Sequence, residues 1–302
     1  MPLSSHARAD LVLVLVTLLA AVGWIFSKEA LAGLPPMLFI GSRFLLAGLV
    51  LLILGRSDLY RIKETKVLGR SLFLGAVMAA ALLCWIQGLD QGSHLGEGAF
   101  ITSLGVVLVP VLARLLFGDT VASSTWVSLP VAVTGLALLS LDGGFDPDPG
   151  QLYFLSAAVL FSFHFTLIAR LAATIPAVIL TANQLLVAGL ISTIASAIIE
   201  PWPAQVATSV WGWFLASALI ATSLRFSLQT YGQGLAPVSH VALIMVLEPV
   251  WTALIAAVWF DETMQPLQIL GCTLIFSAML ISRWRWYRGL LQSLVPSRSG
   301  VK

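Results

Sequence analysis

The sequence consists largely of apolar segments about 20 residues long, joined by short connections that contain glycine, proline or charged residues. A helix needs about 20 mostly apolar residues to cross the hydrocarbon core of a bilayer. The composition agrees with a lipid environment, because only 10% of the residues are charged, against about 25% in a soluble domain. We therefore expect an all-α integral membrane protein with ten transmembrane helices, at residues 9–27, 36–54, 70–89, 97–117, 123–141, 151–169, 176–199, 209–231, 238–259 and 265–284.

Charge, cysteine content and motifs exclude several function classes. The net charge is only +2, and the basic residues lie between apolar segments rather than on one face, so we expect no nucleic-acid partner. Cys84 and Cys272 both lie in apolar segments, which favours buried thiols over a disulfide or a metal site. The sequence contains no Walker loop, no metal-ligand spacing and no Gly-x-Ser-x-Gly elbow. We therefore expect no enzyme activity, no cofactor and no bound metal.

The N-terminal segment also resembles a signal peptide, because Arg8 precedes an apolar run that ends shortly before Ala30-Leu31-Ala32. The apolar core of a cleaved signal is usually about 7–15 residues long, and the run from Leu11 to Phe26 is slightly longer. We interpret it as the first membrane helix, because the internal repeat requires it.

Lysine and arginine gather on one side of the expected membrane, as they do in cytoplasmic connections. Residues 56–70 contain five of them, and residues 283–302 contain another five. Ten helices place both regions on the same side as Arg8. We therefore expect a multi-pass protein of the cell inner (plasma) membrane with both termini in the cytoplasm. The opposite side is mostly acidic, with Asp142, Asp146, Asp148, Glu200, Asp261 and Glu262.

Residues of the first half recur in the second half at a nearly constant offset of 141 to 143 positions. The matches pair Leu46-Ala47-Gly48-Leu49 with Val187-Ala188-Gly189-Leu190, Gln87 with Gln229, and Asp119-Thr120 with Glu262-Thr263. Because each copy has five helices, an odd number, the second copy enters the membrane from the opposite side. Inverted repeats are typical of secondary transporters, whose site lies near the midplane between the copies. We expect a first repeat at 1–148, a second at 149–288, and a cytoplasmic tail at 289–302.

Short motifs follow one another in a characteristic order along both copies. They are Gly23-Trp24-Ile25-Phe26-Ser27-Lys28, Pro35-Pro36, Arg43-Phe44 with Ala47, then Leu247-Glu248-Pro249-Val250, Asp261-Glu262 and Gly271. Together they resemble the EamA domain of the drug/metabolite transporter superfamily, over nearly the whole chain. The resemblance implies a ten-helix carrier with a central cavity between its halves, which moves amino acids, other metabolites or drugs, often outward.

The sequence departs from the family pattern at three positions. Gly105 stands where the repeat places the counterpart of Glu248, Asp119 replaces the usual glutamate, and Gln184 stands where the first copy has Arg43. We therefore expect an asymmetric polar lining.

Glu248 is the most conspicuous candidate, because an ionisable group inside a membrane helix usually faces a cavity or a partner. Pro249 frees a backbone carbonyl and favours a kink or break next to it. One interpretation makes Glu248 a ligand for a substrate ammonium or a protonatable switch. The other makes it a structural carboxylate that caps backbone or pairs with an arginine.

Several basic and polar side chains complete the candidate cavity. Thr222, Arg225 and Gln229 form a polar stripe with Gln233, at helical spacings of 3, 4 and 4. This stripe either lines the cavity or pairs with Glu248 and packs between helices.

Arg43 is interpreted as a structural residue of the family motif or a lining residue, and Lys28 either snorkels to the interface or attracts an anion at the mouth. His164 is either a hydrogen-bonded packing residue or a solute contact. The remaining polar candidates are Gln87, Thr102, Ser103, Asn183 and Gln184.

Aromatic side chains lie inside the expected spans as well as at their ends. Trp24, Trp85, Phe100 and Trp251 are candidates for a cavity wall or a cation–π face, with packing as the alternative.

The whole pattern predicts a secondary transporter that exports amino acids or related zwitterionic solutes by alternating access. The alternatives are a drug or other metabolite carrier, proton-coupled through Glu248, or a membrane receptor or enzyme, for which the connections are too short. We expect a small-molecule substrate and the lipid bilayer as partners, and a monomer.

Overall fold

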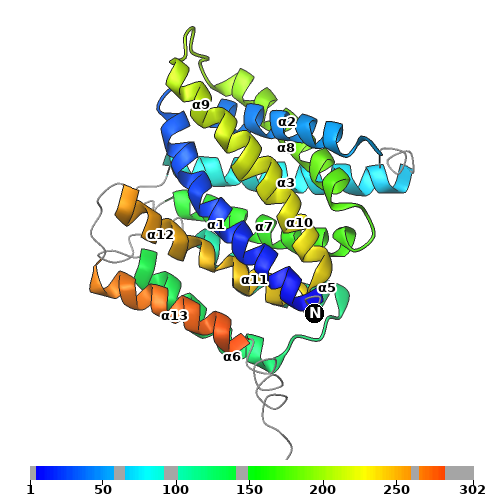
Figure 1. Ribbon diagram of the computed structural model, residues 1–302, viewed down its shortest axis with the longest axis vertical. Helices are drawn as coiled ribbons and strands as arrows, with labels where there is room; N and C mark the ends of the chain where they lie inside the picture. The colour runs from blue at the N-terminus through cyan, green and yellow to red at the C-terminus, as the bar shows by residue number, and fades with distance from the viewer. Residues whose placement is uncertain (1–4, 58–64, 92–100, 141–148, 260–264, 283–302) are drawn as a thin grey trace, which may run out of the picture.

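The computed structural model describes residues 5–57, 65–91, 101–140, 149–259 and 265–282. All regular elements within these residues are helices (Figure 1). They are α1 Ser5–Leu31, α2 Pro36–Leu54, α3 Thr65–Gln91, α5 Gly105–Phe117, α6 Ser123–Ser140, α7 Gly150–Ala172, α8 Ala177–Ile199, α9 Thr208–Ala216, the π-helix η2 Ser217–Leu224, α10 Arg225–Leu235, α11 Val238–Met245, α12 Leu247–Trp259 and α13 Pro266–Ser282.

Six helical stretches of the described residues are long and apolar enough to cross a membrane. They are Arg8–Leu31, Pro36–Leu54, Leu68–Gly88, Gly150–Ala172, Ala177–Ile199 and Val238–Ile255. Shorter apolar helices occupy Ile101–Phe117, Ser123–Leu139 and Pro266–Ser282. The predicted segment 209–231 is helical too, but its helix is divided among α9, η2 and α10, which follow one another without a gap. The structure thus confirms an all-α multi-pass membrane protein.

Proline marks where helices begin. Pro36 and Pro266 are the first residues of α2 and α13, and Pro176 and Pro237 directly precede α8 and α11. Proline suits this position because the first N–H groups of a helix have no partner inside it. The carboxylate of Glu200, at the end of α8, accepts the N–H groups of Met37 and Leu38 at 2.9 Å and so caps α2.

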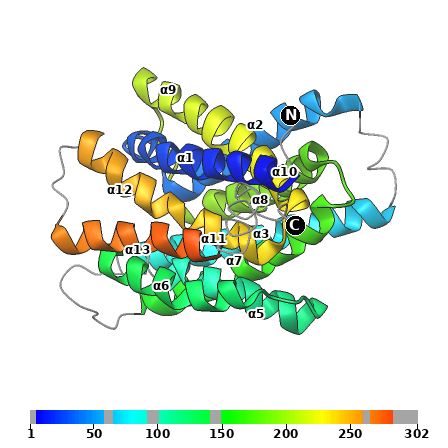
Figure 2. The same cartoon turned by 60° about the horizontal axis from the view of Figure 1, so that its bottom comes forward.

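Two helix pairs form the ends of the molecule, and the other helices lie between them. α2 packs along α8 at one end, and α6 packs along α13 at the other. Between these pairs, α1 contacts η2, α10 and α12, while α3 contacts α7 (Figures 1 and 2). A single long helix, α1, therefore connects both ends of the molecule.

The two end pairs pack closely through glycine. A Cβ atom placed on Gly271 of α13 would lie 2.7 Å from the carbonyl oxygen of Gly135 of α6, and one on Gly135 would lie 2.8 Å from that of Gly271. Small residues allow membrane helices to approach this closely, and van der Waals contact then supplies much of their association.

The apolar core is divided into two large clusters that match the two ends. The first cluster joins α2, α3, α8 and α9, and Ala30 of α1 belongs to it. The second joins α6, α11, α12 and α13, and Leu13 of α1 belongs to it. The part of α1 between these two residues carries the polar contacts of the candidate site.

On the outside, large apolar side chains such as Leu115, Ile198 and Val258 are at least 75% exposed, as expected for a surface that faces lipid.

Candidate functional site

Glu248 lies at a break in the membrane helix that contains it. α11 ends at Met245 and α12 begins at Leu247, so that only Val246 separates the two helices. Pro249 accounts for this break, because proline has no N–H and its ring clashes with the carbonyl four residues earlier, here that of Met245. Glu248 therefore lies in the first turn of α12, where the helix dipole favours a negative charge.

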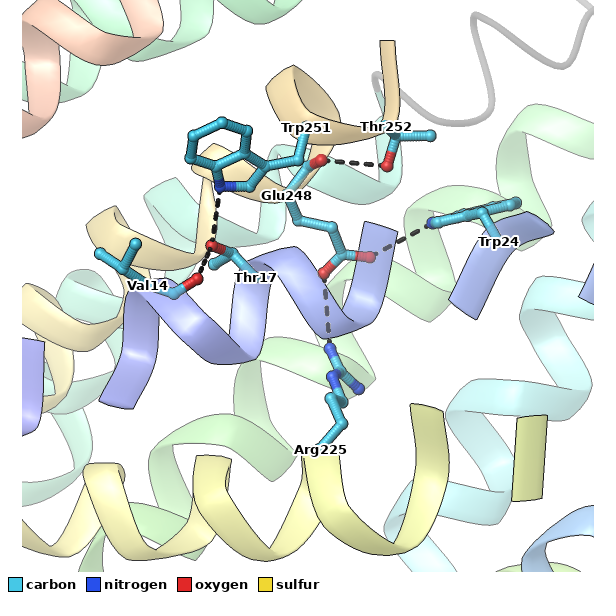
Figure 3. Close-up of polar contacts among 7 residues, drawn as sticks. All are labelled: Val14, Thr17, Trp24, Arg225, Glu248, Trp251 and Thr252. Carbon is cyan, nitrogen blue, oxygen red and sulfur yellow. Dashed lines mark hydrogen bonds and ion pairs between the residues drawn. The ribbon is translucent and has the colours of Figure 1, made fainter. Parts of the chain in front are cut away.

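Two side chains from other helices hold the Glu248 carboxylate (Figure 3). Arg225 Nη2 of α10 lies 3.4 Å from Oε2, and Trp24 Nε1 of α1 donates to Oε1 at 3.3 Å. Charge-assisted N–H···O bonds usually measure about 2.7–2.9 Å, so both contacts are long. The Arg225 side chain is 15% exposed and the Glu248 side chain is 25% exposed. The structure thus shows a long ion pair between Arg225 and Glu248. This pairing is one of the two roles that the sequence left open for the polar stripe.

Three tryptophans of the candidate site make different contacts. Trp24 meets Trp85 of α3 edge to face, with ring centroids 6.2 Å apart. Trp251 lies three residues after Glu248 on α12, but its indole N–H donates to Thr17 Oγ1 of α1 at 3.1 Å (Figure 3). Trp251 therefore anchors α12 on α1, while Trp24 binds Glu248 and contacts Trp85. Phe100, another predicted wall residue, lies outside the described residues.

Arg43 forms a second basic centre next to the first. Its Nη1 donates to Ser27 Oγ of α1 and to Ser217 Oγ of η2, both at 3.0 Å. Its guanidinium also lies over the rings of Phe39 and Phe44, 4.8 and 5.0 Å from their centroids. Arg43 thus connects α1, α2 and η2 through neutral partners.

Polar candidates on α7 and α8 form hydrogen bonds with neighbouring helices. His164 Nε2 lies 2.8 Å from Gln184 Oε1, within hydrogen-bond distance. Asn183 Nδ2 donates to Ser71 Oγ of α3 at 3.0 Å. This geometry corresponds to the hydrogen-bonded packing interpretation of His164.

The π-helix changes the spacing of the predicted stripe. Thr222 Oγ1 donates to the carbonyl of Ser217, five residues earlier, and so binds its own backbone. Arg225 begins α10 after this π-helix and reaches Glu248. Gln229 is buried one turn further on. The α-helical spacing assumed from the sequence therefore applies from Arg225 onward and not to Thr222.

Several candidates have buried polar atoms without a hydrogen-bond partner in the described part of the chain. These atoms are Thr102 Oγ1, Gln184 Nε2, Gln229 Oε1 and the Nε atoms of Arg43 and Arg225. Gln87 and Ser103 are half-buried on their helices, and Lys28 is exposed near the end of α1. The structure thus joins Trp24 and Arg225 directly to Glu248, and joins Trp85 to them through Trp24.

Sequence reasoning missed three hydroxyl groups: Thr17, Ser27 and Ser217. Ser27 and Ser217 bind Arg43, and Thr17 binds Trp251. Ser27 carried a signal, since it lies one turn after Trp24 within the first motif. Ser217 carried none, because it lies 174 positions from Arg43 and only the fold joins them.

A family model for EamA-like transporters matches this chain twice, at residues 7–141 and 148–284. The chain belongs to the EamA-like transporter family. It is 28% identical to an uncharacterized transporter of Archaeoglobus fulgidus, over 90% of this chain and 85% of that protein. It is 26% identical to the uncharacterized transporter YvbV of Bacillus subtilis, over 91% of each chain. One protein crystal structure shares the fold, with a TM-score of 0.79 and 18% identity over 91% of this chain and 97% of that chain.

Family and relatives are transporters rather than enzymes. The site fits this assignment, because it is built from membrane helices of both halves of the chain. The resemblance to the EamA domain and the expectation of a non-enzymatic membrane transporter are therefore confirmed.

Proposed function

We propose that this transporter is a secondary carrier of the cell inner membrane that exports amino acids or related zwitterionic solutes by alternating access. One observation supports this proposal most strongly: the long ion pair between Arg225 and Glu248, at a helix break between two apolar clusters. An ammonium group suits Glu248, and a carboxylate suits the planar fork of Arg225. A zwitterion can therefore take over both halves of the pair.

The arrangement of contacts supports two inverted repeats of five spans, within residues 1–148 and 149–288. α1 of the first copy packs on α9, η2 and α10 of the second, and α3 of the first packs on α7 of the second. Exchanging the two copies turns the first of these contacts into the second, because α1 corresponds to α7 and α3 corresponds to the α9–η2–α10 segment. The same holds for α5 with α7 and for α11 and α12 with α1. A site between the copies changes its access when one copy rocks against the other.

The orientation rests on the distribution of basic residues and places both termini and the tail 289–302 in the cytoplasm. Reporter fusions at each end that are active only in the cytoplasm test this orientation. An inactive fusion at either end contradicts it.

Transport by purified protein in liposomes tests the function itself. We expect amino acids to move down an imposed gradient and to compete with one another for entry. Movement of another solute class without any movement of amino acids contradicts the assignment and leaves a drug or other metabolite carrier.

Proton coupling through Glu248 is the second candidate. It is supported by the position of this carboxylate, which pairs with Arg225 and remains partly exposed. In that case Glu248→Gln removes transport driven by a pH gradient but keeps exchange of one solute molecule for another. Loss of both activities in a folded variant argues for a substrate contact instead, and loss of folding argues for a structural carboxylate.

A further inference from the structure

Among the described residues, the charges at the candidate site do not balance. Arg43 and Arg225 carry two positive charges, and Glu248 supplies one negative charge. Within the part of the chain that the structure describes, Arg43 contacts two serine hydroxyls and two phenylalanine rings but no acidic side chain. A buried charge without a counter-ion is costly in a membrane protein and indicates a functional partner.

The two basic centres belong to one site. Trp24, which binds Glu248, and Ser27, which binds Arg43, are three residues apart on α1, about 4.5 Å along the helix axis. The guanidinium of Arg43 lies over the ring of Phe44, and that of Arg225 lies over the ring of Phe226. These two rings pack edge to face with their centroids 5.8 Å apart, so the two arginines flank one aromatic contact. Each guanidinium also has a buried Nε that finds no hydrogen-bond partner among the described residues. Both arginines therefore have donors to spare at the same place.

We propose that the site recognises an acidic amino acid, with one carboxylate on Arg43, the other on Arg225 and the ammonium on Glu248. This ligand matches the site charge for charge. A neutral zwitterion leaves Arg43 without a counter-ion, and a dicarboxylate without an amino group leaves Glu248 without one. The inference rests on the proposed function, since it names the class of amino acid that the carrier takes.

Isosteric solutes that differ by one charge provide the test. Full-length protein in proteoliposomes is loaded with unlabelled glutamate, and uptake of labelled glutamate competes with glutamate, glutamine, aspartate, asparagine or succinate. We expect glutamate and aspartate to compete at least about tenfold better than their amides and than succinate, because each of those leaves one buried charge unpaired. The rise in unfolding temperature with each solute gives a second readout that does not need transport.

Two arginine variants assign the extra carboxylate. Arg43→Gln should reduce the preference for glutamate over glutamine to about threefold or less, since both ligands then find one guanidinium. Arg56→Gln is the matched control, because it removes the same charge from an exposed position just beyond α2. It should keep the full preference. A purely structural Arg43 would lower stability but would not change this ratio.

Equal competition by glutamate and glutamine in the wild type overturns this inference and leaves the proposed function intact. A protein that moves and binds none of the amino acids overturns both. An unchanged preference in Arg43→Gln overturns the role of Arg43. Should that variant not fold, Arg43→Lys replaces it: it keeps the charge but not the planar fork, so the preference should persist with weaker binding, and its loss contradicts the proposal.

Discussion

At the residue scale, the indole N–H of Trp24 is the contact most open to a clean test. It donates to Glu248 at 3.3 Å, while its ring packs on Trp85. Trp24→Phe keeps an aromatic ring and removes the donor. We expect half-saturation of transport to rise by up to about tenfold, equivalent to about 1.4 kcal/mol, with little change in unfolding temperature.

Trp211→Phe is the control for this substitution, because Trp211 lies partly exposed on α9 and packs on Phe214. Half-saturation should not change in that variant. If Trp24→Phe binds substrate as the wild type does, the indole N–H has no part in holding Glu248 for the solute.

The position of Glu248 shows how far the sequence alone leads at this scale. The sequence located the carboxylate and the adjacent proline, because both are local features of one segment. It also offered pairing with Arg225 as one of two alternatives. It could not choose between them, because the contact joins residues 23 positions apart, on α10 and α12, with α11 between them in the sequence.

At the element scale, the π-helix η2 decides which way two functional side chains point. Ser217 at its start binds Arg43, and Arg225 directly after it binds Glu248. Each residue turns an α-helix by about 100°, so losing one residue rotates the two ends of this segment relative to one another. The π-helix therefore lets both contacts form on one continuous helix. Such insertions often mark functional sites.

Deletion of Ile220 tests this role, because Ile220 lies within η2 and its side chain is 40% exposed. We expect the transport rate to fall by at least about tenfold, as either Arg43 or Arg225 loses its partner. Ile220→Ala, which keeps the length of the segment, should transport almost normally. A deletion variant with wild-type transport would show that the register of η2 does not matter.

The glycine contact between α6 and α13 makes a prediction about stability. Gly271→Ala would place a methyl group 2.7 Å from the backbone oxygen of Gly135, and we expect it to destabilise the protein by about 1–3 kcal/mol. Gly212→Ala is the same change in α9, where nothing lies within 4 Å of the added Cβ. This control should be neutral or slightly stabilising, because alanine favours helix. Thermal unfolding in detergent compares the two, and equal midpoints would contradict the close packing of the pair.

At the scale of the whole molecule, the sequence predicted the fold class because the bilayer imposes a strict rule on helix length and polarity. It also placed most helix starts correctly to within a few residues, as for 36–54 and α2, or 238–259 and the α11–α12 segment. It did not reveal that 209–231 contains a π-helix, because the additional residue in a π-helical turn does not change the apolar pattern of the segment. Nor did it reveal that Phe44, next to Arg43, packs on Phe226, next to Arg225, because the two rings lie in different halves of the chain and meet only in the fold.

Counterflow of amino acids distinguishes a carrier that alternates access to one site from a pore. Proteoliposomes loaded with excess unlabelled amino acid are diluted into a trace of the labelled compound. A carrier exchanges one for the other, so the label should accumulate transiently inside above its outside concentration and then decline. Label that only equilibrates, without this overshoot, would indicate a pore, and the absence of any protein-dependent uptake would contradict amino-acid transport altogether.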